Sequence, residues 1–416
     1  MHVKQLGGCS AWGVLLCTLL AAPAVRADFV QQSHASLLTR NFYLNRDFRQ
    51  AGAPQNLSAE WAQGFILRAE SGYTEGRVGL GVDALGLLGI KLDSSPDRSG
   101  GTGLLQRDRE TRRAEDEYGE LGLTAKIKVS NSVLKVGTLT PVLPLVMIND
   151  TRLLPQTFQG AWLNSTDLAG LTLDLGQFRK TNQRDSSDNE DLTATRATPG
   201  LTSDRFDFLG GNYQWSNTLS TGLHYGVLEG VYKQQVATLA HNWPIATGHA
   251  LRTDLRWSNE SADGNASEVD NRALGAAFTY SYKAHRLGFY FQSMSGDTGF
   301  VYLAASNPYL VNLMQVSDFG FANERSYQLR YDYDFAASGI PGLTFMTRYG
   351  AGDNVEVTGR THDGSEWERD IDIAYVIQSG PLKDVRLQWR NATVRSNFGP
   401  DLDENRLILS YSVALW

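Results

Sequence analysis

The chain has 416 residues, with 45 acidic against 38 basic side chains, and its formal net charge of −7 argues against a nucleic-acid-binding protein, which would be expected to be basic. Its two cysteines, Cys9 and Cys17, stand within the first 27 residues, so the chain beyond them can form neither a disulfide nor a thiolate metal site. We therefore expect no metal, no cofactor and no nucleic-acid partner.

The first 27 residues predict a secretory signal peptide. Lys4 supplies a positive start, an apolar core runs from Trp12 to Ala22, and Val25-Arg26-Ala27 resembles a cleavage site. We expect residues 1–27 to be removed and residues 28–416 to form one domain. No later apolar segment reaches the roughly 20 residues of a membrane-spanning helix, so none is predicted.

Beyond residue 27 the apolar side chains recur with period 2, which predicts β-strands. Near the start the pattern is weak, because one face carries Arg40, Phe42, Leu44 and Arg46. Later in the chain it is clear, with apolar faces formed by Tyr327, Leu329, Tyr331, Tyr333 and Phe335; by Ile371, Ile373, Tyr375 and Ile377; by Val385, Leu387 and Trp389; and by Leu407, Leu409, Tyr411, Val413 and Leu415. The opposite face of 385–390 carries two arginines, Arg386 and Arg390, so this strand is apolar on one side and cationic on the other.

The connections between these segments alternate in length. The short ones are 72–76, 131–132, 166–170, 216–218, 283–285, 337–342 and 379–384. The long polar ones are 93–117, 179–205, 259–271 and about 294–323. This alternation predicts an all-β, transmembrane up-and-down antiparallel barrel of about 18 strands, apolar outside and polar inside. A large soluble domain and a soluble β-sandwich are the alternatives, but a sandwich has less regular loop asymmetry.

Residues 141–156 interrupt the strand pattern. Pro141, Pro144 and Pro155 remove backbone donors, so this segment is not a membrane strand. Irregular backbone is tolerated at membrane depth only where it lines a water-filled space. The segment is therefore predicted to be a constriction loop that points Arg152 at a permeating solute. The alternative is an ordinary extracellular loop with Arg152 in a surface salt bridge.

Several segments resemble the OprD family of substrate-specific outer-membrane porins, through nearly the whole chain after residue 27. They are "LLTRNFYLNRDFR", "EWAQGFILRAESGYTEGRVGLGVDALGLLGIKLD", "NDTRLLPQTFQG", "ERSYQLRYDYDFAASGIPGLTFMTRYG", "ERDIDIAYVIQSGPLKD" and "NRLILSYSVALW". "TLTPVLPLVMINDTRLLPQTFQG" and "RKTNQRDSSDNEDL" are most similar to the branch associated with aromatic and other cyclic carboxylates. The resemblance implies an 18-stranded barrel narrowed by an inward-folded third loop, with lumen arginines that guide carboxylates.

The resemblance also implies site residues. The family's row of lumen arginines corresponds to Arg46, Arg152, Arg390 and Arg406, its acidic residue facing the constriction to Asp318, and its constriction tyrosine to Tyr302. The chain departs from some members at Gln388, where a second arginine is expected, and at Val316, where a tyrosine is expected. Arg386 lies on the same face as Gln388 and is the candidate replacement. Arg330 and Arg348 are interpreted as filling the lumen by pairing with acids such as Asp332, Asp370 and Asp372.

We therefore expect a passive channel in the outer membrane of a Gram-negative bacterium, with both termini periplasmic, that takes up small carboxylates, aromatic or cyclic ones above all. The expected partners are outer-membrane lipid, lipopolysaccharide and the barrel-insertion machinery, and the expected state is a monomer or a weak homotrimer. The alternatives are a general porin of low selectivity and a channel for basic amino acids. A membrane serine peptidase is the remaining alternative, but the G-x-S-x-G motif is missing and Gln177 stands where such members place a histidine, so no enzymatic activity is expected.

Overall fold

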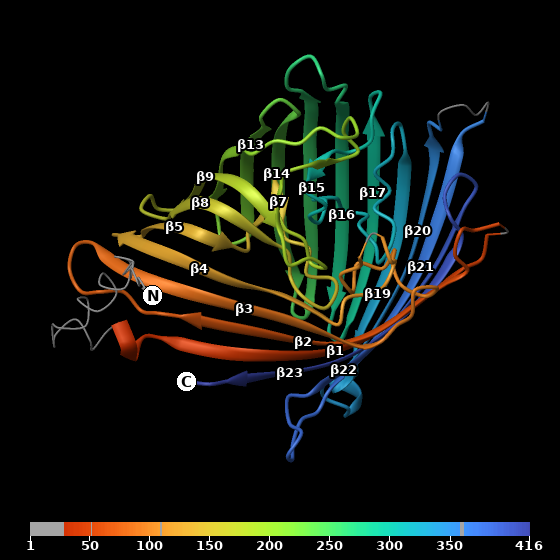
Figure 1. Cartoon of the computed structure of the whole chain (residues 1–416). Coiled ribbons are helices and arrows are strands. Elements are labelled where there is room, and N and C mark those ends of the chain that lie inside the picture. Colours follow the sequence, from red (N-terminus) through yellow and green to blue (C-terminus); the bar gives the residue numbers. More distant parts are fainter. Residues whose placement is uncertain (1–28, 51, 109, 358–361) are drawn as a thin grey trace, which may run out of the picture.

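The chain folds into a closed antiparallel β-barrel (Figure 1). This computed structural model describes residues 29–416 except 51, 109 and 358–361, so the predicted signal peptide lies outside the described residues. The sheet has nineteen strands, of which β10 (Asn189–Asp191) is only a short addition to β9. The other eighteen form the wall, and β1 pairs with β23 to close it. The predicted fold class and strand number are confirmed.

The wall strands follow one another in chain order. They are β1 (His34–Phe48), β2 (Leu57–Glu70), β3 (Gly79–Asp93), β4 (Glu117–Val129), β5 (Ser132–Leu139), β8 (Thr157–Ser165), β9 (Leu171–Asn182), β12 (Phe206–Gln214), β13 (Leu219–Leu228), β14 (Tyr232–Ala246), β15 (His249–Ala262), β16 (Asp270–Tyr282), β17 (His285–Ser295), β19 (Arg325–Asp334), β20 (Leu343–Val355), β21 (Gly364–Val376), β22 (Arg386–Ser396) and β23 (Leu402–Ala414). Each pairs antiparallel with its neighbours, so both chain ends lie at one rim (Figure 1).

Alternating side chains separate the two faces of the wall. On β23, Leu407 and Leu409 are exposed on the outside, whereas Arg406, directly before Leu407, points inward and is buried. A charged side chain on the lipid face costs about 2–4 kcal/mol near the membrane midplane, so the alternation is strongly enforced. The strand β1 is one exception: Phe42 and Leu44 are fully buried on its inner face. This exception explains the weak pattern at the start of the sequence.

The inner face of β1 can be apolar because two loops cover it. Leu104 and Leu105 of the loop 94–116 and Leu153 of the loop 140–156 pack against Phe42, in one buried cluster with residues of β1–β4. The loop 140–156, with its small hairpin β6 (Val142–Leu143) and β7 (Val146–Met147), thus folds into the barrel, as predicted.

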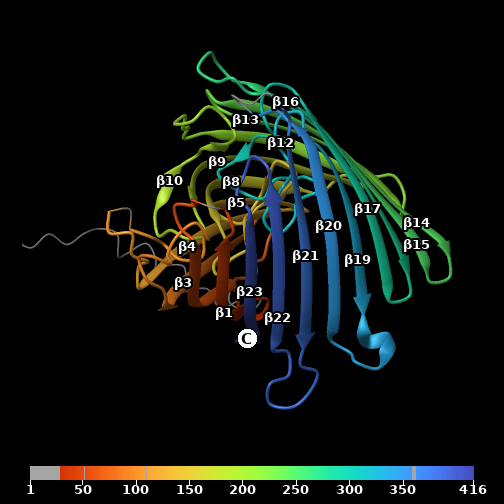
Figure 2. The same cartoon turned by 90° about the vertical axis from the view of Figure 1, so that its right-hand side faces the viewer.

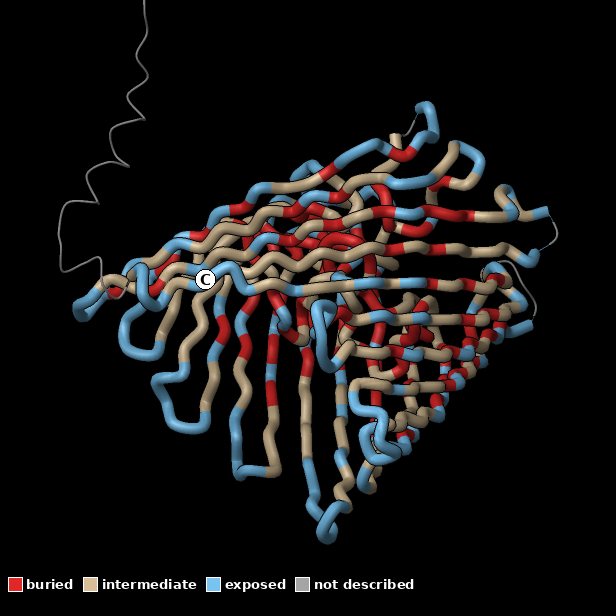
Figure 3. The backbone as a smooth tube through the Cα atoms, turned by 90° about the horizontal axis from the view of Figure 1, so that it is seen from below, coloured by how far each residue is buried: buried red, intermediate tan, exposed pale blue. Residues whose placement is uncertain are grey.

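Two further loops fold inward. The loop 183–205 carries β11 (Ala194–Thr195), which pairs with β18 (Tyr302–Leu303) of the loop 296–324. A second apolar cluster joins these loops and the hairpin β6–β7 to β8, β9 and β12–β14. Viewed from below, buried residues gather in the middle of the barrel, and its outer strand ends are more exposed (Figure 3). The barrel interior is therefore partly filled by protein, which narrows the passage.

The two rims differ as predicted, with turns such as 130–131, 247–248 and 283–284 at the rim of the chain ends and long loops at the other (Figure 2). The predicted loop 259–271 is shorter than expected, because β15 continues to Ala262 and only 263–269 remain outside the strands. Within the part of the chain that is described, no helix is long and apolar enough to cross a membrane.

Burial of Leu153 should hold the loop 140–156 in place. Its side chain lies over Gly64 and Gly89, where any larger residue would collide with it. Leu153→Ala is expected to lower the free energy of unfolding by about 2–5 kcal/mol, because it removes fully buried methyl groups and leaves a cavity. Urea titration in detergent micelles measures this change. Leu168→Ala, at an exposed turn residue, should have almost no effect. Equal effects of the two variants would contradict this packing.

Candidate functional site

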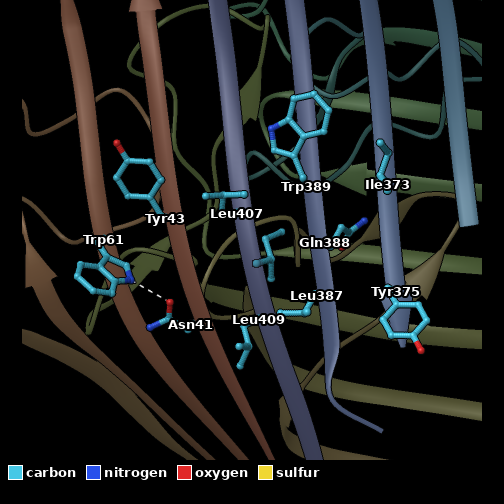
Figure 4. Close-up of a pocket in the computed structure, with 11 residues that line it drawn as sticks. Asn41, Tyr43, Trp61, Ile373, Tyr375, Leu387, Gln388, Trp389, Leu407 and Leu409 are labelled. Carbon is cyan, nitrogen blue, oxygen red and sulfur yellow. Dashed lines mark hydrogen bonds between the residues drawn. The ribbon is translucent and has the colours of Figure 1, made fainter. Parts of the chain in front are cut away.

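A hollow of about 640 Å³ lies on the outer wall (Figure 4). Outward-facing side chains of β1, β2 and β21–β23 line it, with Trp61, Trp389 and Leu407 among them. Figure 4 marks a side-chain hydrogen bond in this hollow, in which Trp61 Nε1 donates to Asn41 Oδ1 at 2.9 Å. Such an apolar surface faces lipid chains and offers no charge to orient a carboxylate, so the candidate site lies on the inner face.

Strand pairing places a row of charged residues across the inner wall from β19 to β23. Directly opposed residues share a face of the sheet. The opposed pairs are Arg330 with Arg348, Arg348 with Asp370, Asp372 with Arg390, and Arg390 with Arg406. We call Arg330, Arg348, Arg390 and Arg406 the arginine row. Two of the three steps along the row cross a single strand pairing, and the step from Arg348 to Arg390 crosses β21, which contributes Asp370 and Asp372.

Glu404 joins two predicted ladder residues. Its Oε1 accepts a hydrogen bond from Arg406 Nε at 2.6 Å, and its Oε2 accepts from Arg46 Nη2 at 2.6 Å. Arg406, 1% exposed, also donates to the carbonyl of Gln315 at 3.0 Å. Arg46 also donates to the carbonyl of Gly101 at 2.5 Å. The two arginines thus face inward but are already bound to the wall and to the loops.

The acids of β21 hold the loop 296–324. Glu368 accepts hydrogen bonds from the amides of Val316 at 3.0 Å and Ser317 at 2.6 Å. Asp370 accepts from Arg348 Nε at 2.8 Å, and Arg348 Nη1 donates to the carbonyl of Leu313 at 3.0 Å. The position of Val316, where a tyrosine was expected, therefore contributes its backbone. The sequence interpretation of Arg348 as a partner of a lumen acid agrees with this geometry.

Arg390 is less buried than Arg406. Its Nε lies 3.1 Å from Asp372 Oδ2, and its side chain is 22% exposed. Gln388 donates to both oxygens of Asp372, at 2.9 and 2.7 Å, so it supports the acid instead of supplying a second positive charge. Arg386 is half-buried on the same face, and no ion pair or side-chain hydrogen bond is formed by it within the described part of the chain.

Arg152 lies inside the barrel but is itself buried. It is 5% exposed, and its Nε donates to the carbonyl of Thr102 at 2.7 Å. Its Nη1 donates to the carbonyl of Thr151 at 3.0 Å. Burial, then the charges of Arg406 and Arg184, lower the pKa of the Arg152 guanidinium. The loop therefore holds a buried guanidinium among other positive charges. A direct contact between Arg152 and a permeating solute stays a prediction.

Two arginines that sequence reasoning did not assign to the site position the tip of the loop 140–156. Arg40 Nη1 donates to Asp150 Oδ1 at 2.8 Å and to the carbonyl of Arg152 at 2.6 Å. Arg184 Nη1 donates to Asn149 Oδ1 at 2.8 Å and to Thr151 Oγ1 at the same distance. Arg40 could have been found because it shares a strand face with Arg46, whereas no sequence signal marks Arg184.

Asp318 and Tyr302 lie in the loop 296–324. Asp318, 9% exposed, accepts two hydrogen bonds from Arg196, at 2.8 and 2.5 Å, so its charge is neutralised by the loop 183–205. The Arg196 guanidinium also lies 4.7 Å from the centre of the Phe321 ring. Tyr302 is half-buried in β18 beside Phe300, with ring centres 6.3 Å apart. The structure thus joins Asp318 to Arg196, which sequence reasoning missed, and contact of Asp318 or Tyr302 with solute stays a prediction.

The interior carries many fixed charges. Among the described residues, no group of three or more His, Cys, Asp or Glu side chains could hold a metal ion. The inner wall presents guanidinium groups that already pair with carboxylates. Their fork-shaped donors also suit the carboxylate of a solute.

The comparisons with known proteins agree with this architecture. A family model described as outer membrane porin, OprD family, matches residues 27–415. The porin-like protein GalP of Pseudomonas putida is 39% identical over 406 residues, which cover 96% of each chain. The crystal structure of Pseudomonas aeruginosa OpdQ is 55% identical, with a TM-score of 0.87, over 94% of this chain and 100% of that one. Pseudomonas aeruginosa OpdK, crystallised with vanillate, is 39% identical, with a TM-score of 0.87, over 93% and 100%.

Proposed function

The chain belongs to the OprD family of outer-membrane porins, and from that premise we propose that it is a passive channel selective for small carboxylates, aromatic or cyclic ones above all. The observation that carries the proposal is the arginine row on an inner wall that the loops narrow. A guanidinium binds a carboxylate through two parallel hydrogen bonds. A series of such groups lets an anion move from one to the next if each binds weakly enough to release it.

The existing ion pairs explain how release could be fast. Arg406 and Arg152 are buried and already bonded, so they contribute a fixed positive potential more than direct contacts. Arg46 is bonded to the buried Glu404. Arg40 and Arg390 are partly buried, with side chains 14% and 22% exposed, and pair with Asp150 and Asp372. A permeating carboxylate would exchange with these two acids for the guanidinium groups. Because the cation has a partner before and after the solute passes, neither state leaves an unpaired buried charge.

The kinship with OpdK favours an aromatic solute. That protein was crystallised with vanillate, an aromatic carboxylate, and is similar to this chain over nearly its whole length. We propose the same class of solute here. A general porin and a basic amino-acid channel are disfavoured by the same wall, because the arginine row presents cations on its inner face. In the outer membrane we propose lipid and lipopolysaccharide as surroundings, insertion by the barrel-insertion machinery, and a monomer or weak homotrimer.

Neutralising Arg40 and Arg390 should reduce carboxylate flux. In liposome swelling, the double variant Arg40→Gln/Arg390→Gln is expected to lower the benzoate rate by about fivefold relative to an uncharged sugar, a change of roughly 1 kcal/mol. Asp150 remains partly hydrated in this variant and Asp372 keeps its bonds from Gln388, so neither acid is left as an unpaired buried charge.

The matched control is Arg369→Gln. Arg369 lies on the neighbouring strand β21 but on the outer face, where it donates to Asn391 and Thr393. This control should leave the ratio of benzoate to sugar flux unchanged. The proposal fails if the double variant transports benzoate as well as the control does, or if the original protein swells liposomes equally fast with benzoate and with arginine.

A further inference from the structure

A cavity of about 620 Å³ lies where β17 and β19–β22 end at the short-turn rim. We call it the exit vestibule, because short turns mark the periplasmic rim of such barrels. Four cationic residues line it: Lys283 in the turn 283–284, Arg286 on β17, Arg330 on β19 and Arg386 on β22. Its volume lies within the roughly 300–1,000 Å³ of small-molecule pockets.

The acids of the exit vestibule are already occupied. Asp332 accepts two hydrogen bonds from Arg330, at 2.8 and 2.7 Å. Asp372 is held by Arg390 and Gln388. The third acid, Asp334, accepts from the amide of Ala336 at 2.9 Å and so caps the short helix Phe335–Ser338. Asp334 keeps its negative charge, so the lining carries four cations against three carboxylates.

Three cations of the lining form no ion pair within the described part of the chain, although Arg286 stands opposite Asp332 in the strand register. Arg286 and Arg386 form no ion pair and no side-chain hydrogen bond with any residue that the structure describes. The Lys283 ammonium lies 5.1 Å from the centre of the Tyr282 ring. By contrast, Arg46, Arg348 and Arg406 higher in the barrel are bonded to acids and to loop carbonyls. The uncommitted positive charge of this wall is thus concentrated near the exit.

We propose that the exit vestibule is a second binding site for one small organic carboxylate, separate from the constriction. This proposal extends the proposed function, and the position of the exit vestibule on the path of the solute rests on that function. An anion there relieves the mutual repulsion of Arg286, Arg386 and Lys283. The guanidinium groups offer paired donors, while the opening toward water keeps binding weak enough for release.

The test compares two double variants that remove the same charge from the same rim. Arg286→Gln/Arg386→Gln changes the exit vestibule, whereas Arg77→Gln/Lys383→Gln changes exposed residues of the turns 71–78 and 377–385, which do not line it. In planar bilayers, benzoate is added to either chamber in KCl. Benzoate is expected to block chloride current from one side, and the vestibule variant should raise the half-blocking concentration by about tenfold or more. The turn variant should leave it unchanged.

A second measurement distinguishes a built site from general surface charge. The reversal potential is measured in a KCl gradient run in both directions. Fixed charge in the vestibule acts most strongly when dilute salt bathes it, since the screening length is about 30 Å at 0.01 M and 3 Å at 1 M. The vestibule variant should thus lose anion preference in one direction mainly. If it matches the turn variant in block and in both gradients, the site does not exist.

The same experiment separates this proposal from the proposed function. Arg40→Gln/Arg390→Gln should keep the one-sided benzoate block while losing the flux advantage of benzoate. Suppose that the original protein swells liposomes equally fast with benzoate and with arginine, but that benzoate still blocks the current and Arg286→Gln/Arg386→Gln abolishes this block. That result would refute carboxylate selectivity and support the binding site in the exit vestibule. The reverse pattern would refute the vestibule alone.

Discussion

Glu404→Gln should destabilise the barrel by about 3–5 kcal/mol, because it leaves Arg46 and Arg406 without the carboxylate that binds both in a buried setting. Urea titration measures the change. The neighbouring Asp403→Asn is the control, since Asp403 lies on the outer face and pairs with the partly exposed Arg49 and Arg395. Exposed pairs are worth only about 0–1 kcal/mol.

A second readout accompanies the stability measurement. If Glu404→Gln inserts into bilayers, its anion preference should rise, because a negative charge has been removed beside the arginine row. If it fails to fold, the double variant Glu404→Gln/Arg406→Gln should recover part of the lost stability, as the charge balance is partly restored. A cost of Glu404→Gln no larger than that of Asp403→Asn would contradict the described ion-pair geometry.

Asp318→Asn is expected to cost a similar amount, about 3–5 kcal/mol, because it leaves the buried Arg196 without a matching charge. The loops 183–205 and 296–324 would lose one of their links, so single-channel conductance should increase. Asp318→Leu/Arg196→Met should recover most of the stability, since an apolar pair of similar volume often replaces a buried ion pair at little cost.

This series separates two roles for Asp318. If it only anchors the loop, the double variant keeps the carboxylate preference of the original protein. If Asp318 meets the solute, as the family resemblance implies, the double variant regains stability but its ratio of benzoate to arginine flux changes. Recovery of neither stability nor selectivity would contradict the assignment of Arg196 as its partner.

The sequence predicted the wall well because lipid imposes its pattern directly on each strand. In β22 and β23, Leu387, Trp389 and Leu407 face outward and Arg406 inward, as the alternation indicated. The pattern failed in β1, since Phe42 and Leu44 are covered by loops and not by water. No local periodicity in a strand records what a distant loop places on its inner face.

The loops were only partly predictable. Prolines marked 141–156 as irregular backbone, and it does fold inward. The inward course of 94–116 and 183–205 was missed, although Leu104 and Leu105 stand as an apolar pair within a polar stretch and are buried. A loop whose sequence is mostly polar can still bury a few side chains. The tertiary fold, and not the local sequence, decides which surface covers them.

The arginines of the site were easier to predict than their partners. Arg46, Arg390 and Arg406 could be assigned from the strand pattern and the family resemblance, and all three face inward. Their partners could not, because Arg46 and Glu404 are 358 residues apart in the chain. Whether an arginine is free, as Arg386 is among the described residues, or already bound decides whether it can hold a solute.

The most direct test of carboxylate selection is the reversal potential of the unmodified protein in a tenfold gradient of potassium benzoate across a planar bilayer. A wall of fixed arginines beside a narrowed passage should make benzoate carry more of the current than potassium. The reversal potential should therefore have the sign of the equilibrium potential of benzoate. A potential of the opposite sign, or one near zero, would contradict carboxylate selection by this wall.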